Sequence, residues 1–191
     1  MDFFKKKSTI ILLGILGVIL FSMMWFFSVR NSLIIIEEGI NGAWAQVENQ
    51  LQRRYDLIPN LVNTVKGVAS HEKEVFTSIA NARSKLAGAQ TPTQKMKASG
   101  MMESALSRLL MVVERYPNLK ANQSFNRLMD ELSGTENRLS VERRRFNEAI
   151  KHFNQSIRLF PKSIVASFSG FEKKDYFKIE ESAKQVPNVQ F

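Results

Sequence analysis

A strongly apolar stretch without any charge, near the start of the chain, restricts the fold more than any other feature. It covers residues 10–29, reads IILLGILGVILFSMMWFFSV and is closed by Arg30. Its twenty residues would span about 30 Å as a helix, which is the thickness of the hydrocarbon core of a bilayer. The stretch predicts a single transmembrane helix at residues 10–29, preceded by a basic leader at residues 1–9 that carries Lys5, Lys6 and Lys7.

The same stretch could instead be the apolar part of a cleavable signal peptide, which also begins with positive charge. A signal peptide has a shorter apolar core and ends in small residues of the A-x-A kind, whereas this stretch ends in SMMWFFSVR. Trp25, Phe26 and Phe27 also fit the aromatic belt found where a helix leaves the bilayer. These features favour a membrane anchor, with cleavage as the alternative.

The charge balance is basic, with 27 Lys and Arg against 18 Asp and Glu. Outside the basic leader, the positive residues are scattered along helical faces, apart from the run at residues 143–145, and no nucleic-acid-binding motif accompanies them. We therefore expect no nucleic-acid partner and favour contact with membrane lipid. There is no cysteine, and His71 and His152 lack metal-ligand spacing, so the sequence predicts no catalytic residue, cofactor or metal site.

After the apolar stretch, apolar residues recur at steps of three and four, the period of amphipathic helices. The pattern predicts helices at about residues 33–69, 72–88, 92–115 and 120–160. The fourth contains a coiled-coil-like heptad column at Phe125, Leu132, Leu139, Phe146, Phe153 and Phe160. Because short connections favour antiparallel neighbours, we predict an all-α fold: a transmembrane helix followed by an antiparallel four-helix bundle at residues 31–160.

The last part of the chain, residues 161–191, has a different composition. It is dense in aromatic residues, namely Phe168, Phe171, Tyr176, Phe177 and Phe191, and is too irregular for one helix. Exposed aromatic side chains at such density would aggregate or bind a partner. We predict an irregular, aromatic-rich C-terminal tail that is held against the bundle.

The first bundle helix contains two residues that a regular amphipathic helix avoids. Pro59 would destabilise a helix interior by about 3 kcal/mol, yet the apolar stripe keeps its phase across it, which predicts a kink. A break capped by Asp56 is the alternative. Arg54 fills the stripe position between Leu51 and Ile58.

The middles of helices face one another in an antiparallel bundle, so Arg54 is expected to meet polar positions of the fourth helix. We predict a polar layer drawn from Arg53, Arg54, Asp56, Glu136, Asn137 and Glu142. Its simplest role is to fix the register of the bundle. A polar functional site inside the bundle is the alternative interpretation.

Several long strings of the chain resemble the LemA family. They include AWAQVENQLQRRYDLIPNLVNTVKGVASHEKEVF, ERYPNLKANQSFNRL and ELSGTENRLSVERRRFNEAIKHFN, and the resemblance covers about residues 40–191. It implies a membrane-anchored all-α protein without established catalytic residues. It also implies a membrane-embedded zinc protease as a partner in quality control of the cell envelope.

These features predict a structural or interaction scaffold of the bacterial cell envelope that forms a homo-oligomer, and not an enzyme. Binding of lipid or a small ligand at the membrane is the alternative. The lysine-rich leader carries more positive charge than the far end of the apolar stretch, where Glu37 and Glu38 follow Arg30. By the positive-inside rule, we expect a single-pass inner-membrane protein with a cytoplasmic N-terminus and the bundle outside the cytoplasm. The family resemblance implies the opposite orientation, with a short N-terminus outside the cytoplasm, and we follow the charges of the leader.

Overall fold

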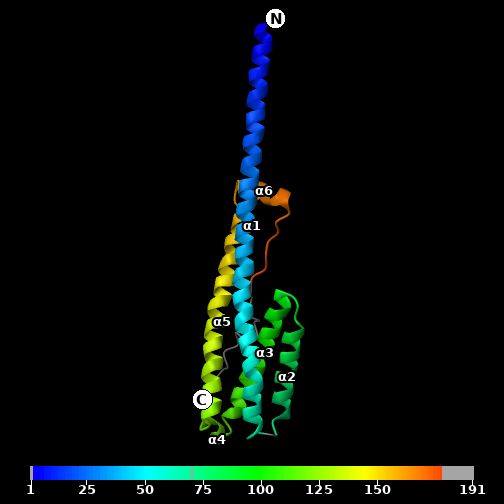
Figure 1. Ribbon diagram of the computed structural model, residues 1–191. Coiled ribbons are helices and arrows are strands. Elements are labelled where there is room, and N and C mark those ends of the chain that lie inside the picture. Colours follow the sequence, from blue (N-terminus) through cyan, green and yellow to red (C-terminus); the bar gives the residue numbers. More distant parts are fainter. Residues whose placement is uncertain (1, 70, 178–191) are drawn as a thin grey trace, which may run out of the picture. The chain divides into compact units, whose positions relative to one another are not determined.

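A computed structural model describes residues 2–69 and 71–177 of the chain, with side chains from residue 11 onward. All regular elements in these ranges are helices, which agrees with the predicted all-α class. They are α1 (Asp2–Lys66), α2 (Lys73–Gly88), α3 (Pro92–Val113), α4 (Pro117–Lys120), α5 (Gln123–Ser156) and α6 (Lys162–Ser169) (Figure 1).

The apolar stretch and the predicted first helix of the bundle form one helix, α1, of 65 residues. We expected a separate bundle helix at about residues 33–69, but the helix runs without interruption from Asp2 to Lys66. The short polar sequence Arg30-Asn31-Ser32 contains neither proline nor glycine, so nothing local ends the helix there. Among the described residues, α1 is the one helix long and apolar enough to cross a membrane.

Pro59 lies inside α1, and the helix does not break at that residue. The residue that would have capped a restarted helix, Asp56, instead accepts a hydrogen bond from Gln52 Nε2 at 2.9 Å. This i, i+4 contact is a typical side-chain pair on the surface of a continuous helix.

The described residues divide into two compact units. Unit 1 contains residues 2–41 and 148–175, and unit 2 contains residues 42–69, 71–147, 176 and 177. In unit 1 the buried apolar side chains come from α1, α5 and α6: Leu33, Ile40, Ile150, Phe153, Val165 and Ala166. The ring of Phe171 packs edge-on against Phe153, with centroids 6.1 Å apart.

Unit 2 has its own hydrophobic core, to which α1, α2, α3, α4 and α5 all contribute. Its buried members include Ile58, Leu61 and Val65 of α1, Phe76 and Ile79 of α2, Leu106 and Leu109 of α3, Leu119 of α4, and Phe125 and Leu132 of α5. The neighbouring helices α2 and α3 are joined by a short connection (Figure 1). It ends in a capping box, in which Thr91 Oγ1 accepts from Gln94 N at 3.2 Å and Pro92 follows as the first helical residue.

The predicted heptad column is buried from Phe125 to Phe153, but it ends earlier than expected. We predicted a helix from 120 to 160, whereas α5 covers Gln123–Ser156. Phe160 therefore lies outside the helix and is 80% exposed. The following Pro161 disfavours a helical conformation of the residue before it, which limits how far α5 can extend.

The tail is more ordered than the sequence pattern indicated. It contains α6, a helix of eight residues that ends at Ser169 and is capped by Gly170, whose φ of 72° suits glycine. Phe171 packs against Phe153 and Phe177 is buried, but Tyr176 is 36% exposed and Phe168 is 82% exposed. The expected contact of Phe191 lies outside the described residues.

Candidate functional site

Two arginines lie on buried helix faces of unit 2 and give it a charged interior. Arg54 of α1 sits in the apolar stripe between the buried Leu51 and Ile58, and 8% of its side-chain surface is exposed. Arg143 of α5 follows Leu139 by four residues and is 10% exposed in its side chain. Residues spaced by three or four share a helix face, which explains why both arginines point inward.

Each arginine contacts two glutamates, and we name Arg54, Glu103, Glu136 and Arg143 the charge cluster. Arg54 forms a direct ion pair with Glu136, and its Nη1 lies 3.9 Å from Glu103 Oε1. Arg143 pairs directly with Glu103, and its Nη1 lies 3.8 Å from Glu136 Oε1. Three helices, α1, α3 and α5, thus meet in a group of two positive and two negative charges.

Arg143 has two further contacts that fix its guanidinium. Its Nη2 donates to the hydroxyl of Ser99 on α3 at 2.9 Å, and Ser99 is itself buried. The ring of Phe177 lies 4.8 Å from the guanidinium carbon, a cation–π contact. Asn147 holds Phe177 in place, because its side chain accepts from the Phe177 N at 2.7 Å and donates to the Phe177 O at 3.0 Å.

The electrostatic balance of the cluster is governed by burial. Burial lowers the pKa of Arg54, Glu103 opposes this effect, and the like charge of Arg143 adds to it. A guanidinium does not lose its proton in proteins, so Arg54 stays charged at physiological pH despite the lowered pKa. The Nε atoms of both arginines are buried without a partner among the described residues. A paired but incompletely satisfied buried charge is a weak contributor to stability.

The other residues of the predicted polar layer lie outside the cluster. Arg53 pairs with Glu131 at 2.9 Å on the surface, where 55% and 41% of the two side chains are exposed. Glu142 pairs with Arg145 at 2.8 Å, and Asn137 is exposed. The helical rotation of about 100° per residue turns Arg53 and Asp56 away from the face that carries Arg54.

Sequence reasoning missed Glu103, Ser99 and Arg143. Arg143 looked like part of a solvated run of three arginines, although its spacing from Leu139 and Phe146 places it on the heptad face. Ser99 and Glu103 lie four residues apart on α3, and Leu106 follows on the same face. These spacings from apolar residues were the sequence signal that could have indicated the three positions.

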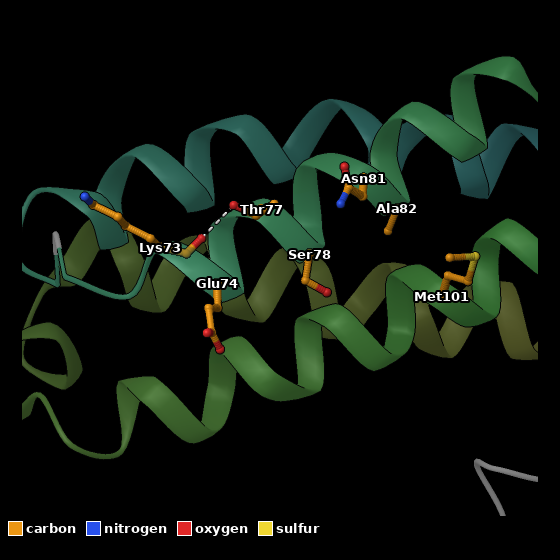
Figure 2. A pocket seen from close by; sticks show the side chains of 7 residues that line it. All are labelled: Lys73, Glu74, Thr77, Ser78, Asn81, Ala82 and Met101. Carbon is orange, nitrogen blue, oxygen red and sulfur yellow. Dashed lines mark hydrogen bonds between the residues drawn. The ribbon is translucent and has the colours of Figure 1, made fainter.

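The described surface also has a shallow hollow between α2 and α3, of about 470 Å³. Figure 2 shows its lining, which includes Lys73, Glu74 and Met101, and the Thr77 hydroxyl donating to the Lys73 carbonyl at 2.8 Å. None of its lining residues belongs to the charge cluster. The part of the chain that the structure describes contains no group of three His, Cys, Asp or Glu residues that could hold a metal ion.

The comparison with known sequences gives the family. The sequence model of the LemA family matches residues 43–191, which include the whole charge cluster and α6. The chain belongs to the LemA family. The resemblance inferred from the quoted strings is thereby confirmed, and the match begins after the apolar stretch of α1.

Three magnetosome proteins are similar to this chain. MamQ 2 and MamQ 1 of Paramagnetospirillum magneticum are each 26% identical to this LemA-family chain over 185 aligned residues, covering 83% of the chain and 68% of the relative. MamQ of Magnetospirillum gryphiswaldense is 25% identical with the same coverage.

Proposed function

We propose that this LemA-family chain is a single-pass membrane anchor joined to a helical scaffold that holds partner proteins at the bilayer. The observation that carries the proposal is α1, a single helix that is apolar and unburied near its start and supplies buried core residues near its end. A helix of this kind would supply both the bilayer span and part of the core of a folded unit.

The apolar part of α1 has the exposure that lipid contact requires. Within its most apolar window of 18 residues no residue is buried, and Leu12, Leu13 and Val18 are more than 60% exposed. A core helix of a soluble protein would bury these side chains against other elements. Lipid tails are the environment that covers them at no desolvation penalty.

The scaffold itself is proposed to be an antiparallel four-helix bundle formed in unit 2 by α1, α2, α3 and α5. The shared core and the short connection between α2 and α3 support this arrangement. The charge cluster suits a structural role, because each arginine is paired with both glutamates. The hydroxyl of Ser99 beside it is buried and already accepts from Arg143. We therefore propose register fixation for the cluster, and no enzymatic activity for the chain.

The scaffold is proposed to work as a homo-oligomer and to hold a membrane-embedded zinc protease as a partner. In native membranes an amine-reactive crosslinker is expected to give a dimer or larger species of the full chain. The membranes are first washed at alkaline pH, which removes proteins that lack an apolar span. Release of the chain in that wash would contradict the anchor, and a monomer alone, while a known oligomer in the same membranes crosslinks, would contradict the oligomer.

We propose an orientation with the N-terminus in the cytoplasm and the bundle outside it, following the three lysines of the leader. Because the chain has no cysteine, one introduced cysteine reports its own location. Ser133→Cys, at an exposed position of α5, is expected to react in intact cells with a membrane-impermeant thiol reagent once any outer membrane is opened. Ser8→Cys in the leader is the control and is expected to react only after the inner membrane is broken. The reverse pattern would place the bundle in the cytoplasm.

A further inference from the structure

In unit 1, α6 and the turn before it expose an apolar surface that no other described residues cover. We name this surface the α6 face; its members are Leu159, Phe160, Ile164 and Phe168, with exposed fractions of 64%, 80%, 46% and 82%. The opposite side of α6 is fully packed, since Val165 and Ala166 are at most 2% exposed. A docked helix of a soluble protein normally turns polar residues outward, so the α6 face requires another occupant.

The segment that carries the α6 face is tied to α1 near the end of the apolar stretch. The side chain of Asn154 donates to the Lys174 O and accepts from the Lys174 N, both at 2.9 Å. Lys174 Nζ in turn pairs with Glu37 Oε1 at 2.7 Å. Glu37 lies seven residues after Arg30, about 10 Å along the helix. This part of α1 and α6 (Figure 1) belong to the same compact unit.

The charges within the segment that carries the α6 face are positive. Residues 157–170 contain Arg158 and Lys162 and no acidic residue. Arg158 is exposed and Lys162 is half-buried. An apolar face combined with positive residues is the composition of helices that lie in the interface of a bilayer containing anionic lipid.

We propose that the α6 face is a second membrane contact, which lies on the bilayer surface next to the point where α1 leaves it. Phe160 and Phe168 enter the boundary between headgroups and acyl chains, and Arg158 and Lys162 contact anionic headgroups. This inference rests on the membrane anchoring proposed above. Two contacts would fix the rotation of α1 about its own axis, which a single helix in lipid does not do.

Lipid fits this surface better than a second copy of the chain. The four apolar side chains offer roughly 500 Å², whereas a stable protein interface buries about 800 Å² on each partner. The surface is also close to the unburied part of α1, whose covering material is lipid under the proposed function. A second copy and bulk water are the competing occupants that the experiment must distinguish.

The test uses the full chain in lipid nanodiscs that contain anionic phospholipid, with a spin label on one introduced cysteine. Phe168→Cys and Ile164→Cys both report on the α6 face. The first variant removes a phenylalanine that is proposed to contact lipid, whereas the second keeps it, so the result does not depend on that loss. Collision with oxygen, which concentrates in lipid, is compared with collision with a water-soluble nickel chelate. We expect an oxygen-to-nickel ratio at both positions several-fold above that of Ser133→Cys, the exposed control on α5.

Val18→Cys, within the apolar stretch, separates failure of this inference from failure of the anchor. A water-like ratio at Val18 would overturn the anchor and the inference together. If Val18 gives a lipid-like ratio while Phe168 and Ile164 give a water-like ratio, the membrane contact of the α6 face is overturned and the anchor is not. The same conclusion follows if both reagents are excluded at Phe168 and Ile164, as they would be in a contact with protein. The double change Arg158→Glu and Lys162→Glu is expected to lower the ratio at Phe168, and an unchanged ratio would overturn the headgroup contact.

Discussion

Replacing Arg54 by leucine is expected to lower the free energy of unfolding of unit 2 by about 3 kcal/mol. The change keeps an apolar side chain in the stripe of α1 but leaves Glu136 without its direct partner and Glu103 with Arg143 alone. Breaking a buried ion pair destabilises a protein by about 3–5 kcal/mol, and partial solvation of the orphaned carboxylate reduces that loss. Glu136, at 40% side-chain exposure, keeps some access to water. Urea unfolding of the chain in detergent, followed by circular dichroism, measures the effect.

The neighbouring arginine provides a matched control for this substitution. Arg53→Leu removes the same charge one residue earlier in α1, where the pair with Glu131 is exposed on both sides. Exposed ion pairs contribute about 0–1 kcal/mol, so a small change is expected. If the two variants lost the same free energy of unfolding, the buried ion pairs of Arg54 would be no more important for stability than an exposed pair. That result would contradict the proposed role of the charge cluster.

The position of Arg54 could be predicted because it follows from local periodicity. Its position in the apolar stripe can be recognised from the spacing of residues within one helix, because Leu51 and Ile58 lie three residues before it and four residues after it. Both of these residues are buried. The capping box at Thr91 is local in the same sense, and it forms as its residue pattern indicates. Features set within one helical turn are the ones that a single sequence specifies.

The composition of the charge cluster could not be read in the same way. Glu103 and Arg143 are 40 residues apart in the chain, and their contact depends on how α3 and α5 align. Many charged residues along each helix have nearly equivalent spacing, so selecting Glu136 over Asn137 or Glu142 requires the helix rotation that packing sets. The ends of α5 and the existence of α6 were missed for a related reason, since docking of Val165 and Ala166 stabilises α6 more than its short local pattern does.

Replacing the entire charge cluster with apolar residues is expected to restore the stability that Arg54→Leu removes. In the fourfold variant, Arg54→Met, Glu103→Leu, Glu136→Leu and Arg143→Met, no carboxylate is left without a partner. Apolar replacement of a whole buried ion cluster is often neutral or stabilising by about 1–4 kcal/mol. The lowered pKa of Arg54 indicates the same balance, because burial outweighs the attraction of Glu103. The variant should therefore unfold at a urea concentration equal to or above that of the native chain.

The same variant separates stability from register. If the cluster fixes the alignment of α1, α3 and α5, its removal should leave the unfolding midpoint high while reducing the uniqueness of packing. Faster amide hydrogen exchange along α5, or several resonances for one methyl group of Leu139, would report this loss, whereas the surface double change Arg53→Met and Glu131→Leu should produce neither. A fourfold variant as unstable as Arg54→Leu would instead show that the charges stabilise unit 2 beyond satisfying one another. A fourfold variant that is stable and uniquely packed would remove register as the reason for the cluster, because the apolar core alone would then determine how the three helices align.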